Sequence, residues 1–228
     1  MLTSLVYYVF FNKLRTDYYA SLTKLRITEH VTDLGLEYSA SMSFRDYYIH
    51  IVKKANYLIH SMMCCFKGHN TAFYLFLYVT YVRPLLEFNS VIWSPTLIKD
   101  ITLLESVQRN FTRRICLRDT PYCDRLKYLN LKSLEERRVI ADLKKFFKLR
   151  NFDYADRYFV RCHSLRYSYN YQNVLSQSSL VKSFWFFRVV KFWNFLPMHV
   201  KMCNSYNSFC NVLMTVNFND LLKSAART

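Results

Sequence analysis

The side chains that could ligate a metal or act as nucleophiles are seven cysteines and six histidines, and their spacing favours neither role. No two cysteines are separated by two residues, the usual pairing in structural zinc sites. Cys162 beside His163, and Cys116 seven residues before Cys123, lack a second ligand pair at a suitable distance. The histidines are isolated, and no serine or cysteine has an activating context. We therefore expect no metal site, no catalytic residue, and reduced thiols in an intracellular protein.

Phosphate-binding loops are excluded by the scarcity of glycine. Gly35 and Gly68 are the only two glycines in the 228 residues. Both the P-loop and the dinucleotide-binding fingerprint need several glycines, because the backbone must turn sharply and approach phosphates closely. We therefore expect no cofactor and no small-molecule substrate.

The charge of the chain points to a polyanionic partner. Its 32 lysines and arginines outnumber its 16 acidic residues, and most of the excess lies after residue 98. A net charge of +16 attracts either nucleic acid or an acidic membrane surface. The membrane is the weaker reading: no stretch combines a wholly apolar face with a lysine-lined edge. The apolar run 1–11 is interrupted at Asn12 and falls short of the roughly 20 residues that span a bilayer.

Apolar periodicity predicts amphipathic helices that would present these basic residues on their outer faces. Helical spacing runs over residues 42–66, with Ser43 able to cap the start and Gly68 to end it. A second helix should begin near Thr71 and be buried on most sides through 73–82, until Pro84 bends or ends it. A third stretch covers 98–117.

The second half of the chain is predicted to mix helix and strand. A fourth helix should run over 133–149, because Ser133 and Glu136 have the spacing of a capping box. Residues 152–181 are expected to form a loop with one or two short strands, and 205–213 a last helix. The aromatic residues of 184–193 could stack on unpaired bases, but core packing is favoured because their neighbours are apolar.

Four segments of the sequence carry extended motifs, and their order along the chain is informative. Residues 83–95 read Arg-Pro-Leu-Leu-Glu-Phe-Asn-Ser-Val-Ile-Trp-Ser-Pro, and 104–115 read Leu-Glu-Ser-Val-Gln-Arg-Asn-Phe-Thr-Arg-Arg-Ile. Residues 125–138 read Arg-Leu-Lys-Tyr-Leu-Asn-Leu-Lys-Ser-Leu-Glu-Glu-Arg-Arg, and 186–197 contain Phe-Phe-Arg-Val-Val and Trp-Asn-Phe-Leu-Pro. In this order the four segments resemble the region after the palm of non-LTR (LINE-type, jockey-like) retrotransposon reverse transcriptases. The resemblance extends from about residue 30 to 214.

This resemblance implies a mainly α fold, a helical thumb-like bundle followed by a smaller α+β carboxy-terminal region. Residues 1–39 would be a remnant of the palm-proximal segment, 40–120 the thumb-like domain and 121–228 a connector region. Such a thumb lies along the backbone of a template-primer duplex without reading bases. The implied partners are RNA or an RNA–DNA duplex and the polymerase's palm and fingers, in a nuclear or cytoplasmic ribonucleoprotein.

The residues fall into two expected sets. The nucleic-acid contacts would come from basic residues on helices, namely Lys53, Lys54, Arg109, Arg113, Arg114, Arg137, Arg138, Lys144, Lys145 and Arg188. Some of these could instead be ordinary solvated charges, and Arg137 or Arg138 could pair with Glu135 or Asp142. The other motif residues are expected to have core and turn roles, namely Arg83, Pro84, Glu87, Trp93, Pro95, Trp193, Asn194 and Pro197.

Polymerase chemistry requires palm carboxylates that this sequence does not contain. Two-metal catalysis uses paired carboxylates that hold divalent ions about 4 Å apart. The sequence has no Asp-Asp pair, and its nearest approach, Asp153 and Asp156, lies far downstream of any palm position. The function expected is therefore sequence-independent binding of RNA or template-primer duplex without catalysis. A helical protein-interaction module, or a decayed retroelement copy without activity, are the alternatives.

We predict that the purified chain will incorporate no nucleotides. A primed RNA template, labelled deoxynucleotides and either Mg²⁺ or Mn²⁺ form the assay, with an active reverse transcriptase as the positive control. Incorporation above the protein-free background would contradict the assignment, because no paired aspartates are present to hold the two ions.

Overall fold

The structure, a computed structural model, describes residues 19–20, 23–24, 30–33, 35–39, 43–68, 70–116, 119–150, 159–162, 169–173, 185–218 and 222. Two compact units comprise residues 1–48 and 49–228. The first contains two antiparallel hairpins, β1 (Tyr19–Ala20) with β2 (Thr23–Lys24) and β3 (His30–Asp33) with β4 (Leu36–Ser39). Gly35 takes a positive φ of 78° in the β3–β4 turn, a conformation that favours glycine.

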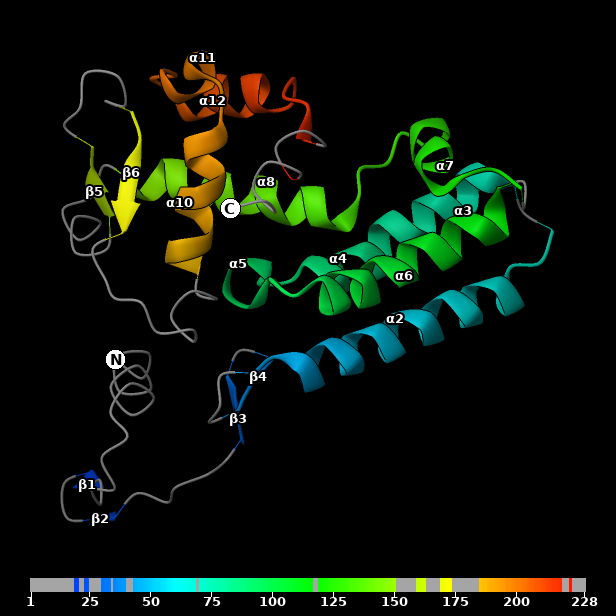
Figure 1. The fold of residues 1–228 in the computed structure, drawn as a ribbon. Helices are drawn as coiled ribbons and strands as arrows, with labels where there is room; N and C mark the ends of the chain where they lie inside the picture. Colours follow the sequence, from blue (N-terminus) through cyan, green and yellow to red (C-terminus); the bar gives the residue numbers. More distant parts are fainter. Residues whose placement is uncertain are drawn as a thin grey trace. The chain divides into compact units, whose positions relative to one another are not determined.

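The second unit begins with a group of helices whose apolar faces are buried. Helix α2 (Arg45–Cys65) starts in the first unit and buries Ile51, Ala55 and Ile59, which follow one another at intervals of four residues. Its start is supported by Ser43, whose hydroxyl accepts from the Arg45 N–H at 3.5 Å. Gly68, with φ +82°, follows its end. Helices α3 (Thr71–Leu77) and α6 (Ile98–Ile115) belong to the same group (Figure 1). Tyr78, the residue directly after α3, stacks on Phe111 of α6 at 4.3 Å between ring centroids.

A π-helical turn, η1 (Tyr78–Val82), lies between α3 and α4 (Arg83–Glu87). The Arg83 N–H bonds to the Tyr78 carbonyl five residues earlier, and Pro84 follows in the first turn of α4. Proline has no N–H and its ring crowds the preceding turn, so a locally wider turn lets the helix continue. Pro84 therefore modifies this helix without ending it. The next helix, α5 (Ser90–Trp93), follows Asn89, which adopts a left-handed φ of 52°.

The expectation that 73–82 is buried on most sides is wrong. Leu77, Tyr78 and Val82 are buried, but Phe76 and Tyr81 are 61% and 59% exposed. Leu77 and Tyr78 are adjacent and Val82 lies four residues after Tyr78, so the buried positions form a single stripe, on which Tyr78 stacks against Phe111 of α6.

Helix α8 (Leu134–Leu149) joins the first helices to the carboxy-terminal core. It packs on α4, α5 and α6 along one side and on α10 (Trp185–Phe195) and α12 (Tyr206–Leu213) along the other. Figure 1 shows α8 between these two groups. Residues 49–228 thus form one compact unit that continues across position 120, where the sequence-based division placed a domain boundary.

The carboxy-terminal core is aromatic. Phe146 lies 4.9 Å from Trp193 and 5.1 Å from Tyr171 between ring centroids, and Phe147 stacks on Phe209 at 4.3 Å. The antiparallel strands β5 (Phe159–Arg161) and β6 (Tyr171–Asn173) cover one side of α10. Helices α7 (Tyr122–Tyr128) and α11 (Met198–Lys201) complete the described helices. Together these elements confirm a mainly α fold with a small amount of strand.

One buried ion pair connects three segments of this unit. The Arg188 guanidinium donates to the Asp142 carboxylate through Nε at 2.7 Å, and both side chains are almost fully buried. It also donates to the carbonyls of Val91 at 2.9 Å and Ser94 at 3.2 Å. Arg188 on α10 therefore fixes α8 and the end of α5 at the same point.

Replacing Arg188 with methionine should lower the free energy of unfolding by about 3–5 kcal/mol, because the Asp142 carboxylate would stay buried without its partner. Urea denaturation followed by circular dichroism measures the change. Arg188→Lys keeps the charge but not the planar fork that reaches two backbone carbonyls, so its loss should be smaller. Equal losses in the two variants would show that the buried charge is not the cause.

Candidate nucleic-acid interface

Glu105 on α6 anchors the beginning of α8. Its carboxylate accepts from the backbone N–H groups of Leu134 at 3.0 Å and Glu135 at 3.3 Å. The first N–H groups of a helix have no partner within the helix and carry partial positive charge, so a carboxylate there is stabilising. Ser133 completes the cap by accepting from the Glu136 N–H at 3.1 Å, as the capping box predicted. The Glu136 side chain pairs with Lys132 instead of returning to Ser133.

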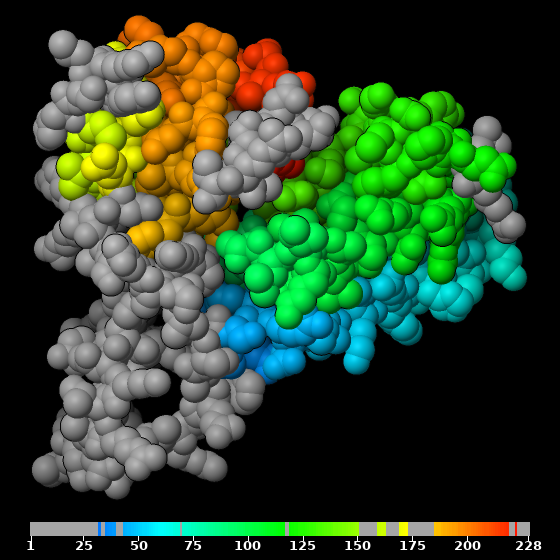
Figure 2. Space-filling model, in the orientation of Figure 1, coloured from blue at the N-terminus to red at the C-terminus, as the bar shows by residue number. Residues whose placement is uncertain are grey.

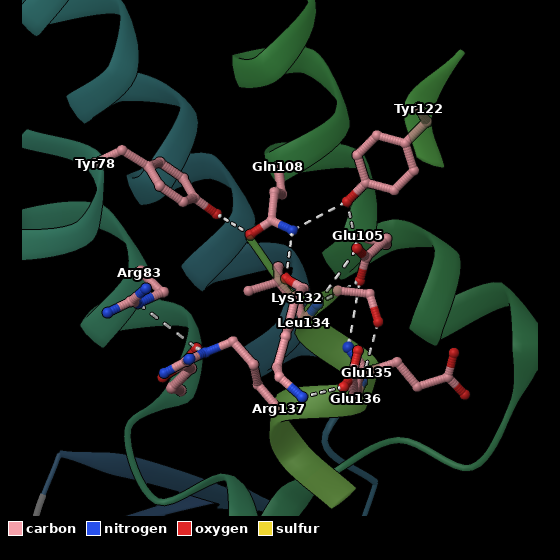
Figure 3. Close-up of polar contacts among 12 residues, drawn as sticks. Tyr78, Arg83, Glu105, Gln108, Tyr122, Lys132, Leu134, Glu135, Glu136 and Arg137 are labelled. Atoms are coloured by element: carbon pink, nitrogen blue, oxygen red, sulfur yellow. Dashed lines mark hydrogen bonds and ion pairs between the residues drawn. The ribbon is translucent and has the colours of Figure 1, made fainter. Parts of the chain in front are cut away.

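Gln108, one turn along α6, is the centre of a buried polar network (Figure 3). Its amide oxygen accepts from the Tyr78 hydroxyl at 2.9 Å, and its amide nitrogen donates to the Lys132 carbonyl at 3.0 Å. The same nitrogen donates to the Tyr122 hydroxyl, which in turn donates to Glu105. Burial, followed by the negative charge of Glu105, raises the pKa of Tyr122, so the phenol keeps the proton that it donates.

Glu87 forms a second joint, between α4 and α8. Its carboxylate accepts two hydrogen bonds from Arg137, through Nε and, at 2.9 Å, through the second terminal nitrogen. Arg83, four residues before Glu87, lies 4.0 Å from the same carboxylate. Such two-point contacts match the planar guanidinium to the planar carboxylate. Arg83 and Glu87 thus have the structural role that the motif implied.

Three of the ten basic residues expected to contact phosphate are not available for it. Arg188 is buried against Asp142, and Arg138 is 2% exposed, where its charge acts on Glu135 and Asp142. Arg137 is held by Glu87 and not, as the sequence suggested, by a carboxylate of its own helix. Arg188 and Arg138 are buried, and Arg137 would have to give up its two hydrogen bonds to Glu87, so these three are corrected to structural residues.

Seven of the ten remain at the surface, on three helices. They are Lys53 and Lys54 on α2, Arg109, Arg113 and Arg114 on α6, and Lys144 and Lys145 on α8, of which Lys144 alone is half-buried. Arg109 and Arg113 are four residues apart and share one face of α6. Arg109 also lies 5.1 Å from the centre of the Tyr122 ring, which holds its guanidinium in place.

The end of α6 concentrates positive charge. Arg113 and Arg114 are exposed in its last turn, where the carbonyl ends of the helix favour cations. The Thr71 hydroxyl donates to the Ile115 carbonyl at 3.3 Å, which brings the beginning of α3 to this point. Exposed Lys67, four residues before Thr71, adds a cation that the sequence reasoning did not select. No sequence pattern pairs Lys67 with α6, so this neighbouring cation could be identified only from the structure.

The remaining motif residues have core and turn roles. Trp93 and Trp193 are 1% and 0% exposed, and each indole N–H donates to a backbone carbonyl, of Phe88 and Tyr169 respectively. Asn194 exchanges two hydrogen bonds with the backbone of Tyr171, as a neighbouring strand would. Pro95 is buried after α5, and Pro197 caps the start of α11.

Two further residues act as joints that sequence reasoning missed. Arg150, at the end of α8, donates to the carbonyls of Lys201 at 3.3 Å and Cys203 at 3.2 Å. Lys201 donates to Asn194 and Asn170, and burial lowers its pKa. Sequence reasoning could not identify these two cations as buried, because their hydrogen-bond acceptors are backbone carbonyls and the Asn170 amide. No carboxylate partner in the sequence pointed to them.

The described residues contain no cluster of three or more histidines, cysteines, aspartates or glutamates that could hold a metal ion. Among the helices of the same residues, none is both long enough and apolar enough to cross a membrane. The apolar run 1–11 lies outside the described residues.

We predict that Glu105→Ala will lower the free energy of unfolding by about 2–3 kcal/mol, because two buried N–H groups and the Tyr122 hydroxyl lose their acceptor. Glu136→Ala is the matched control and should cost less than about 1 kcal/mol, since its pair with Lys132 is partly exposed. Urea denaturation of both variants measures the difference. Similar losses would argue against the anchoring role of Glu105.

Comparison with known proteins gives one curated relative and no family. No protein-family model matches the chain, and no solved structure matches it. The uncharacterized protein B0403.1 of Caenorhabditis elegans is 27% identical over 137 residues, which cover 58% of this chain and 69% of the relative. The chain is thus similar to a nematode protein whose name assigns no activity.

Proposed function

We propose that this chain is a fragment of a non-LTR retrotransposon reverse transcriptase that binds RNA or a template-primer duplex without sequence specificity and without catalysis. Two observations support the family assignment. The four motif segments occur in the order of that family, and they are bonded to one another in the fold: Glu105 to the start of α8, Glu87 to Arg137, and Arg188 to the carbonyls of Val91 and Ser94. Segments that coevolve as one structural unit would be expected to meet in this way.

The cations at the end of α6 carry the binding proposal. Arg113 and Arg114 are exposed, and neither forms an ion pair with a carboxylate of the described residues. Nearer the start of α6, Gln108 bonds to the Tyr78 hydroxyl and the Lys132 carbonyl, and Glu105 bonds to the first N–H group of α8. These contacts fix the helix that carries the two cations. Phosphate contacts of this kind position a nucleic acid and carry no sequence information.

A second surface favours a protein partner, namely the palm or fingers of such a polymerase. Phe88, Ile92, Leu97 and Ile98, in and around α5, are 50%, 42%, 55% and 80% exposed. These residues follow one another along a short segment, in turquoise to green on the face that Figure 2 shows. Adjacent exposed apolar side chains are typical of protein contacts and unfavourable for phosphate binding. The two surfaces thus favour different partners.

RNA binding should weaken steeply with salt. Six of the candidate cations are exposed. If all six contact phosphates, the affinity for RNA should fall by about 10²–10³ between 50 and 200 mM salt, because each contact releases counterions. Fluorescence anisotropy with two RNAs of unrelated sequence measures the slope, and the two should agree.

The double variant Arg113→Gln, Arg114→Gln tests the α6 surface within this experiment. It should reduce the salt slope by about 1.4–1.8, the change expected for two phosphate contacts. Lys99→Gln, Lys127→Gln removes the same charge from two other exposed positions and should leave the slope nearly unchanged. A flat salt response of the unmodified chain, or equal effects of both double variants, would overturn the proposal.

A further inference from the structure

The outward face of α2 combines cations with an exposed aromatic ring. The inward face is buried through Ile51, Val52, Ala55 and Ile59. The opposite positions at helical spacing are all exposed and are listed here: His50, Lys53, Lys54, Tyr57 and His60. After Asp46 in the first turn, α2 contains no acidic residue. The outward face therefore carries the positive charges of Lys53 and Lys54 and no negative charge beyond the first turn.

Tyr57 is the unusual member of this face. Its side chain is 70% exposed in the middle of a long helix, where a polar residue would be the ordinary choice. Lys53 and Lys54 precede it by four and three residues, so both ammonium groups are its neighbours on the helix surface. A free ring beside two cations is the combination that holds an unpaired nucleotide: the base stacks on the ring and the flanking phosphates contact the lysines.

Among the described residues, the three other aromatic side chains that are exposed to a similar degree lack this arrangement. Tyr128 on α7 is 78% exposed, but the neighbouring Lys127 pairs with Asp124 at 3.3 Å. Phe76 and Tyr81 are exposed on a segment, 73–82, that contains no basic residue. Tyr57 is thus distinguished from them by its charged surroundings as well as its exposure.

The geometry also selects among polyanions. In a duplex the faces of the bases are covered by their stacked neighbours, so a helix surface reaches phosphates but not rings. A membrane surface would need an apolar face on the same side, whereas the neighbours of Tyr57 at helical spacing include Lys53, Lys54 and exposed His60. A single-stranded partner uses both the ring and the cations.

We propose that the outward face of α2 binds unpaired RNA, with one base stacked on Tyr57 and the adjoining phosphates held by Lys53 and Lys54. This inference rests on the proposed function, because it names the form of nucleic acid that one part of the interface takes. The α6 cations remain a phosphate-binding surface that accepts single strands and duplexes alike.

Anisotropy titrations of the full chain with a short labelled oligouridylate and with an RNA duplex test the inference. Tyr57→Ala should weaken binding of the single strand by about 5- to 100-fold and leave duplex binding within about twofold. Tyr57→Phe, which keeps the ring, should retain the affinity. Tyr128→Ala is the matched control, an equally exposed tyrosine on another helix, and should change neither affinity. Alanine is a better helix former than tyrosine, so α2 should persist.

A cross-linking experiment gives a readout that does not depend on affinity. Irradiation of the complex with an oligouridylate that carries 5-iodouridine should attach the RNA to the peptide containing Tyr57, identified by mass spectrometry. The inference would be overturned by an unchanged single-strand affinity in Tyr57→Ala, or by an equal loss for single strand and duplex. In either case, steep salt dependence of RNA binding would still support the proposed function. Absence of binding to either RNA at low salt would overturn both.

Discussion

Buried charge without a partner is too costly to persist, and this constraint determines how residues 49–228 are held together. Arg188 pairs with Asp142, Arg137 with Glu87, and Glu105 accepts the free N–H groups at the start of α8. Each of these contacts joins segments that are distant in sequence. The motif residues of the four segments are therefore best understood as joints, since a change in one partner leaves the other uncompensated in the core.

The same constraint sorts the cations by role. Arg137 and Arg113 are the same residue type on the outer half of amphipathic helices, and sequence periodicity treats them alike. They differ because Glu87, fifty residues away from Arg137, faces it across α4 and α8. Periodicity and caps did predict α2, α6, α8 and α12, because those signals are local. Pairing between residues that are distant in sequence leaves no local pattern, so the paired arginines could be identified only from the structure.

Aromatic residues illustrate the same limit. The core role expected for the aromatic run 184–193 is confirmed at Trp185 and Trp193, because α8 and the β5–β6 pair cover that side of α10. The run 73–82 is equally apolar, yet Phe76 and Tyr81 are exposed. Hydrophobicity alone does not determine burial; the number of neighbouring elements does. Segment 73–82 is covered on one stripe, whereas α10 is covered on several sides.

A stiff interior and a charged exterior together suit binding that must ignore sequence. Phosphates recur at regular intervals along a strand, so a protein that contacts them gains affinity only if its cations keep their spacing. The network around Gln108 and Glu105 fixes α6 against α8 and leaves Arg113 and Arg114 outside it. Cations on a mobile support would lose part of the binding free energy of each contact to the entropy cost of ordering them. The proposed binding surface therefore depends on residues that never touch the ligand, such as Gln108 and Glu105.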